Sequence, residues 1–154
     1  MTITAFVSQA MVGVFHTMLG TALPAIRQTL SMGIAQAGIF GASAWLGFTL
    51  AIFAGGVLSD LIARHRVILL GCLMMGLGAL MLGAWTSFPL NCFLIALIGG
   101  GTGVVTSSTT ALVMALFPGK EGPLVNSLHF FYALGTIAIQ WLTLPFMYTL
   151  EDTV

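Results

Sequence analysis

The chain has 154 residues, of which 58% are hydrophobic and only 5% are charged, and its formal net charge is zero. A soluble domain carries about 25% charged residues, so this composition excludes an ordinary soluble fold and indicates an integral membrane protein. The zero net charge also argues against a nucleic-acid partner, which needs a basic surface.

Five apolar segments are long enough to cross a bilayer, because a transmembrane helix needs about 20 residues. They cover residues 3–26, 34–58, 67–85, 90–117 and 123–150. The connections between them are short, so neighbouring helices should be antiparallel. The alternating polarity of membrane β-barrel strands is absent from the sequence. The sequence therefore predicts an all-α membrane protein of five transmembrane helices.

The first segment carries Gln9, Gly13, His16 and Gly20 on one helical face and is expected to end near Pro24. His16 falls close to the middle of the membrane. An imidazole can donate and accept hydrogen bonds and can titrate near neutral pH, so His16 is a candidate contact for a solute or a proton. The alternative is a packed histidine whose hydrogen bonds are satisfied within the protein.

The connection between the second and third segments contains Asp60, Arg64 and Arg66, three of the eight charged residues in the chain. Charges at a membrane are costly and usually have a function. Arg64 lies four residues after Asp60, within reach of an ion pair if the turn is helical. The arginines can also serve as orientation anchors, but acidic residues hardly affect orientation, so Asp60 favours a functional role.

The fourth segment has small residues at every fourth position, Gly99, Gly103 and Ser107, which let two helix backbones approach closely. Beside them runs a polar strip. It consists of Thr102, Thr106 and Thr109. This strip either faces a water-filled cavity or bonds back to the carbonyl groups of its own helix.

The fifth segment places several polar side chains on one face, at residues Asn126, His129, Thr136, Gln140 and Thr143. Such groups would be unsatisfied against lipid, so the face should contact protein or water. A solute pathway is the favoured interpretation, and a hydrogen-bonded seam with another helix is the alternative. Asn126 and His129 lie near the cytoplasmic end of the segment, and Gln140 lies deeper in the membrane.

The positions of the basic residues predict the orientation. Arg64, Arg66 and Lys120 fall in the second and fourth connections, and only Arg27 falls in the first. The N-terminus should therefore face the cytoplasm, with the chain in the cell membrane. Motifs of hydrolases, metalloproteases and nucleotide-binding enzymes are absent, so no enzyme activity, cofactor or metal site is expected.

Residues 55–66 resemble the loop signature of the major facilitator superfamily, G-x-L-x-D-(R/K)-x-G-(R/K)-(R/K). Four positions match it: Gly56, Leu58, Asp60 and Arg64. Leu61 and Ala63 depart from it. The run Phe117-Pro118-Gly119 and the stretch from Asn126 to Gly135 resemble the sugar-permease branch, which includes fucose permeases.

This resemblance implies the first five helices of a twelve-helix, 6+6 fold, with the sixth helix and the C-terminal half missing from this chain. It implies alternating-access transport of a small polar, sugar-like solute, either uncoupled or coupled to protons or sodium. Candidate solute contacts are Gln9, His16, Thr106, Asn126, His129 and Gln140. Candidate gate residues are Gly56, Asp60, Arg64 and Arg66, with Gly56 allowing close helix approach. The alternative is a non-transporting membrane scaffold that acts through its small-residue seams.

Overall fold

The computed structural model describes residues 2–151, and the side chains of residues 3–143. It contains five helices, which confirms the predicted all-α architecture. They are α1 (Thr2–Thr29), α2 (Ile34–Leu61), α3 (Arg64–Met81), α4 (Phe88–Leu116) and α5 (Glu121–Glu151). Each is long and apolar enough to cross a membrane.

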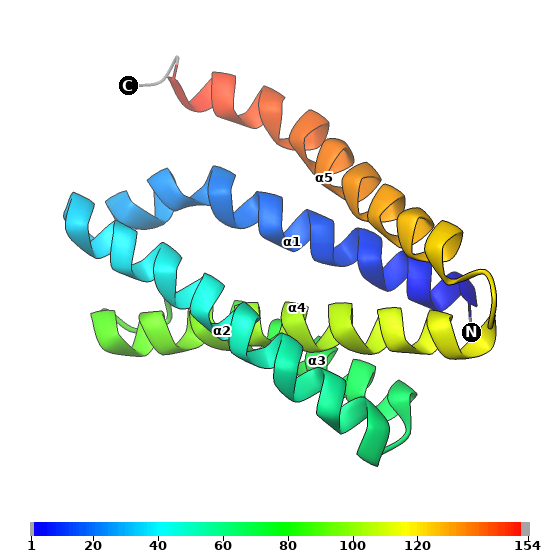
Figure 1. Ribbon diagram of the computed structural model, residues 1–154. Coiled ribbons are helices and arrows are strands. Elements are labelled where there is room, and N and C mark those ends of the chain that lie inside the picture. Colours follow the sequence, from blue (N-terminus) through cyan, green and yellow to red (C-terminus); the bar gives the residue numbers. More distant parts are fainter. Residues whose placement is uncertain (1, 152–154) are drawn as a thin grey trace.

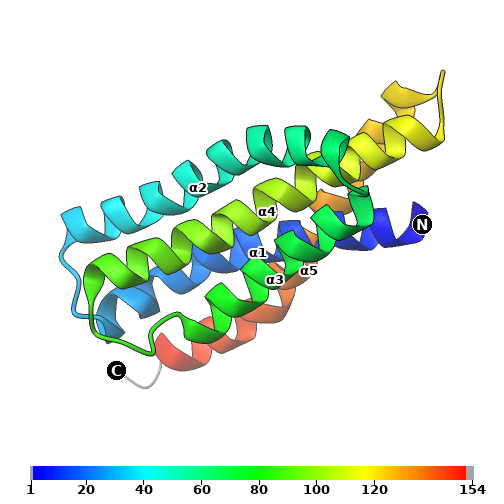
Figure 2. The ribbon, with the colours of Figure 1, turned by 90° about the horizontal axis from the view of Figure 1, so that it is seen from below.

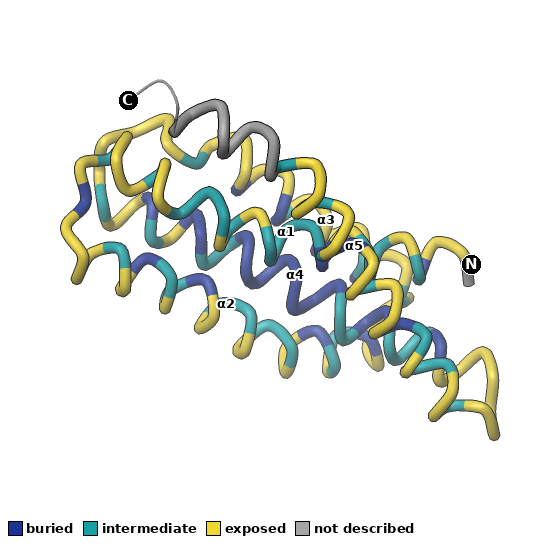
Figure 3. Tube along the Cα trace, turned by 90° about the horizontal axis from the view of Figure 1, so that it is seen from above, coloured by how far each residue is buried: buried dark blue, intermediate teal, exposed yellow. Residues whose placement is uncertain are grey.

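Helix α4 forms the centre of the bundle. Helices α2 and α3 pack along it, α1 packs on α4, and α5 packs mainly on α1 (Figures 1 and 2). Figure 3 shows the result as burial, with α4 the most deeply buried helix and the outer face of α2 exposed. An apolar outer surface is expected of a bundle whose surroundings are lipid.

Glycine determines how closely α2 and α4 approach. A Cβ atom at Gly99 would overlap the carbonyl oxygen of Ala44, and one at Gly103 would crowd the carbonyl oxygen of Phe48. The predicted close approach at Gly99 and Gly103 is therefore confirmed. Gly71 and Gly101 make the equivalent backbone contact between α3 and α4.

Gly56 does not take part in this seam, contrary to the prediction. A Cβ atom at Gly56 would meet no atom within 4 Å, whereas one at Gly55 would crowd Ser107 and Val104. The reason is helical geometry, because adjacent residues point about 100° apart and only one of them can face α4.

The connection between α2 and α3 is shorter than predicted. Helix α2 continues to Leu61 and α3 begins at Arg64, so Asp60 lies in the last helical turn of α2 and not in a loop. At the other end of the bundle, Pro24 lies inside α1, which continues to Thr29.

The connection between α3 and α4 is held by one side chain, Asn91. Its Oδ1 accepts a hydrogen bond from the Gly83 N–H at 3.0 Å, and its Nδ2 donates to the carbonyl oxygens of Trp85 at 2.7 Å and Ser87 at 3.0 Å. Gly83 adopts a positive φ of 79°, which ends α3 before the predicted residue 85. Asn91 itself is fully buried, and its three bonds are part-buried.

We expect Asn91→Leu to destabilise the protein by about 1 kcal/mol, because the Gly83 N–H and the Trp85 carbonyl lose their partner, whereas the Ser87 carbonyl keeps the backbone N–H of residue 91. Thermal unfolding of the purified protein in nanodiscs measures this change. Asn126→Leu is the matched control, since Asn126 is exposed on α5 and should change stability by less than about 0.5 kcal/mol. Equal effects of the two substitutions would contradict the role assigned to Asn91.

Candidate functional site

His16 joins three helices near the middle of the bundle. Its Nδ1 lies 3.1 Å from the hydroxyl oxygen of Tyr132 on α5, and its Nε2 lies 3.2 Å from the Oγ1 of Thr102 on α4. The histidine therefore connects α1 to both helices on which it packs.

The direction of these hydrogen bonds follows from proton counting. The single hydroxyl proton of Thr102 is donated to the carbonyl oxygen of Gly99 at 2.7 Å. Thr102 must therefore accept the proton of His16 Nε2, and in the neutral imidazole Nδ1 is then an acceptor. Tyr132 is left as the donor to Nδ1. Both ring nitrogens therefore have hydrogen-bond partners within the protein. This agrees with the alternative interpretation of His16, a packed histidine rather than a solute contact.

Aromatic side chains surround the histidine. The rings of Trp45 and Phe48 on α2 have their centroids 5.3 Å and 5.0 Å from that of His16. Beside this cluster lies a cavity of about 190 Å³, which His16, Trp45 and Thr102 help to line. The rest of its wall is largely apolar, including Phe15, Leu19, Leu23, Ala44, Ile95 and Ile98.

A second polar group lies nearer the N-terminal end of α1. Gln9 is 2% exposed and Thr109 is fully buried, yet Gln9 Oε1 and Thr109 Oγ1 have no hydrogen-bond partner. The Oγ1 of Thr106, one turn before Thr109, is likewise buried and without a partner. Of the predicted threonine strip, only Thr102 bonds back to its own helix.

The packing of α1 on α4 brings these atoms to one level. The two helices are antiparallel. The bond between His16 and its α4 threonine fixes their register at one level, and the packing of Ala5 with Val113 fixes it about three turns away. Halfway between these levels, the register sets Gln9 opposite Thr109. The unpartnered oxygen atoms of Gln9 and Thr109 therefore lie at one level between α1 and α4. Together with Thr106 Oγ1, which is one turn away on α4 and also lines an open cavity with Gly56 of α2, they are called the polar patch.

The polar stripe of α5 is in contact with another helix only in part among residues 3–143. Asn126, His129 and Gln140 are exposed. Another face of α5 meets α1, where Leu128 is buried and a Cβ atom at Gly135 would overlap the carbonyl oxygen of Ala10. Thr136 of the same stripe faces α1, where a Cβ atom at Gly13 would lie 3.2 Å from its Oγ1. The solute pathway and the helix–helix seam therefore both stay predictions.

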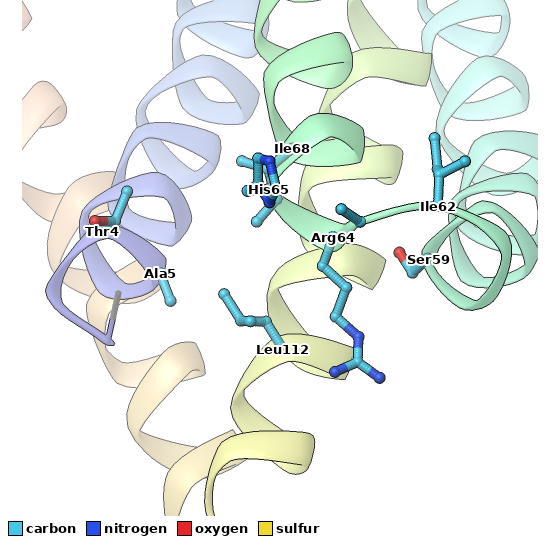
Figure 4. Close-up of a pocket in the computed structure, with 9 residues that line it drawn as sticks. Thr4, Ala5, Ser59, Ile62, Arg64, His65, Ile68 and Leu112 are labelled. Atoms are coloured by element: carbon cyan, nitrogen blue, oxygen red, sulfur yellow. The ribbon is translucent and has the colours of Figure 1, made fainter.

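The gate candidates lie at the end of the bundle that contains the N-terminus. Asp60 and Arg66 are exposed, whereas the Nε of Arg64 is buried without a hydrogen-bond partner. Arg64 lines a cavity of about 500 Å³ together with Thr4, Ser59 and Leu112, and its side chain extends past Leu112 (Figure 4).

The predicted ion pair between Asp60 and Arg64 does not form among the described side chains, within the 4.0 Å limit for such pairs. Asp60 ends α2, while Arg64 opens α3 and extends along α4. Within the same part of the chain, no group of three histidine, cysteine or acidic residues is placed to hold a metal ion.

The comparison with protein families decides the relationship. Residues 5–149 match the family described as the Major Facilitator Superfamily. The chain belongs to this superfamily. Its members are membrane transporters and not enzymes, in agreement with the five apolar helices. The chain matches no curated protein and no solved structure.

Several residues of this superfamily member escaped the sequence analysis. Tyr132 was not expected at the site, because nothing in the sequence separates it from other aromatic residues of an apolar helix. The same holds for Trp45 and Phe48. The role of Asn91 could have been predicted from the sequence. An amide inside an apolar segment just after a turn is costly unless its hydrogen bonds are made, so it indicates a bond to the turn.

Proposed function

We propose that this chain forms part of a carrier that moves a small polar, sugar-like solute across the cell membrane by alternating access. The polar patch between α1 and α4 supports the proposal most directly. Three buried oxygen atoms there, on Gln9, Thr106 and Thr109, have no partner in the protein. Each such group costs about 1–3 kcal/mol when it stays unsatisfied.

A hydroxylated solute would remove this cost as it passes. The amide oxygen of Gln9 accepts hydrogen bonds, and the threonine hydroxyls donate and accept them. A sugar carries the same neutral donors and acceptors in large number. None of these three residues is charged, which supports a neutral solute over an ionic one, although the charged Arg64 lines one cavity with Thr106.

The exposed stripe of α5 would form a further wall of the pathway. Asn126, His129 and Gln140 would be unfavourable against lipid, so we propose that they face the solute path. The positions of Arg64, Arg66 and Lys120 support an orientation with the N-terminus in the cytoplasm. The polar patch would then lie on the cytoplasmic side of His16.

We expect saturable uptake of at least one neutral sugar into proteoliposomes that contain the complete carrier to which this chain belongs. Gln9→Leu should reduce this uptake about tenfold, equal to about 1.4 kcal/mol, because the solute loses an acceptor at the patch. Gln28→Leu is the matched control, since Gln28 is an exposed residue near the other end of α1 and should not alter uptake. Uptake that rises linearly with concentration for every sugar of a broad panel would overturn the proposal.

The scaffold alternative has less support. A scaffold would offer its small-residue seams to a partner, but Gly99, Gly101 and Gly103 are already used within the chain, against α2 and α3. A stoichiometric partner chain that co-purifies with the protein, together with no saturable uptake, would favour the scaffold.

We also propose that Asp60 and Arg64 belong to a gate. A carboxylate at the C-terminal end of α2 opposes the helix dipole, which disfavours negative charge there by about 0.3–1 kcal/mol. The buried Nε of Arg64 lacks a partner. Gly56, Arg64 and Thr106 line one open cavity along α2 and α4, next to the polar patch. Asp60 and Arg64 are thus both placed unfavourably in this structure. This supports the proposal that each finds a partner in another state of the carrier.

Asp60→Asn is expected to slow uptake several-fold while the orientation in the membrane stays the same, because acidic residues hardly affect topology. Initial uptake rates and cysteine accessibility at the two membrane faces measure the two properties. Asp60→Glu, which keeps the charge, should retain most of the activity. Uptake by Asp60→Asn at the original rate would refute a role in gating.

A further inference from the structure

The cavity beside His16 differs in chemistry from the polar patch. Its volume is about 190 Å³, and apart from the indole N–H of Trp45, polar side chains contribute to its wall only through His16 and Thr102. Both are saturated by the protein: Thr102 donates to Gly99 and accepts from His16, and the other nitrogen of His16 accepts from Tyr132.

An occupant of this cavity would therefore find one free hydrogen-bonding side chain, the donor indole N–H of Trp45, and no free side-chain acceptor. The proton of a hydroxyl group placed there would lose its acceptor in water without replacement, which costs about 1–3 kcal/mol in proteins. An apolar group would instead gain by leaving water, at about 0.8 kcal/mol for each buried CH₂. The wall of the cavity therefore favours binding of an apolar group over binding of a hydroxyl group.

Size and shape agree with this selection. A cavity of about 150 Å³ lined by leucine, isoleucine and phenylalanine stays dry and binds benzene in another protein. The cavity here is of similar volume and has the same kinds of side chain, with the rings of Phe15 and Trp45 on its wall. A single aromatic ring or a short alkyl chain would fill it.

The cavity and the polar patch are close enough for one molecule to reach both. Thr102 lines the cavity, and Thr106 carries the nearest unpartnered hydroxyl on the same helix. Four residues of helix correspond to a rise of about 6 Å, the length of one sugar ring.

We infer that the His16 cavity binds an apolar aryl or alkyl group of the transported solute, while its hydroxylated part contacts Gln9, Thr106 and Thr109. This inference rests on the proposed transport function and narrows the solute from a plain sugar to an amphipathic molecule such as an aryl glycoside.

Glycine positions provide a test with a matched control. Gly41 lines the cavity, and a Cβ atom there would meet nothing within 4 Å, so Gly41→Leu can fill the space without a backbone clash. Gly38 lies one turn earlier on α2 and is equally free of contacts, but it does not line the cavity. Gly38→Leu adds the same side chain outside the site.

The experiment measures binding of phenyl glycosides and of the corresponding free sugars to the protein in nanodiscs. The emission of Trp45 reports binding when Trp85 and Trp141 are replaced by phenylalanine. We expect each phenyl glycoside that binds to do so at least tenfold more tightly than its free sugar. This advantage should disappear in Gly41→Leu and persist in Gly38→Leu.

Three outcomes would overturn the inference. The phenyl group could give no advantage, or no binding of any glycoside could be seen, or the advantage could survive in Gly41→Leu. A lipid acyl chain is a competing occupant: if Gly41→Leu alone relieves quenching of Trp45 by lipids brominated on their acyl chains, the cavity holds lipid. The proposed transport fails separately, when the sugar panel shows no saturable uptake.

Discussion

Replacing Gly99 by alanine is expected to disrupt the centre of the bundle, whereas the same change at the adjacent Gly100 should be tolerated. A Cβ atom at Gly99 would overlap the backbone carbonyl of Ala44, which cannot move without shifting α2. At Gly100 the nearest atom is the terminal methyl carbon of Met74, at 3.2 Å. The end of a methionine side chain can give way at little cost.

Overpacking a well-packed core costs about 1–3 kcal/mol, and a clash between two backbones belongs at the upper end of that range or beyond it. We expect Gly99→Ala to lose most of its folded yield or to unfold at a much lower temperature. Gly100→Ala should stay within about 1 kcal/mol of the original protein. Chromatography in detergent and thermal unfolding measure the pair. Equal stability of the two variants would contradict the packing of α2 on α4.

This pair of residues shows what a single sequence can predict. The repeat of small residues in α4 predicted a close helix contact, and that contact exists, because helical periodicity alone fixes which residues share a face. The sequence could not say which helix lies opposite. Gly55 and Gly56 are equally small, and only the position of α4 decides that Gly55 makes the contact.

The same limit applies to the site. Gln9, His16 and the threonine strip could be chosen from their polarity in apolar segments. Their hydrogen bonds could not be predicted, because these depend on the antiparallel register of α1 on α4, which no local pattern encodes. That register leaves Gln9 without a partner and gives His16 two, so two similar candidates have different roles.

The helix seams also differ in kind. Glycines bring α4 into backbone contact with α2 and with α3 at the positions where these helices cross most closely. The α1–α4 seam instead holds His16, Thr102 and the unpartnered oxygen atoms of the polar patch. The buried oxygen atoms without a partner at the α1–α4 seam support a solute path along that seam.

Tyr132→Phe is expected to destabilise the protein by about 1–3 kcal/mol, although it removes a single oxygen atom. The hydroxyl of Tyr132 is the donor to His16 Nδ1, and without it a buried acceptor has no partner. The phenylalanine keeps the ring and its packing, so the change isolates the hydrogen bond. The free energy of unfolding in denaturant measures it.

A double-mutant cycle with His16→Leu tests whether the hydroxyl of Tyr132 acts through His16. Leucine at position 16 removes the acceptor, so in that background the Tyr132 hydroxyl has nothing to donate to at the site and Tyr132→Phe should cost little. Groups in direct contact show coupling of about 0.5–3 kcal/mol in such cycles. If Tyr132→Phe were equally destabilising with and without His16, the hydroxyl would act through another group. Coupling within this range would support a His16 whose ring nitrogens are hydrogen-bonded within the protein. The face of its ring would then be the part that contacts an occupant of the cavity.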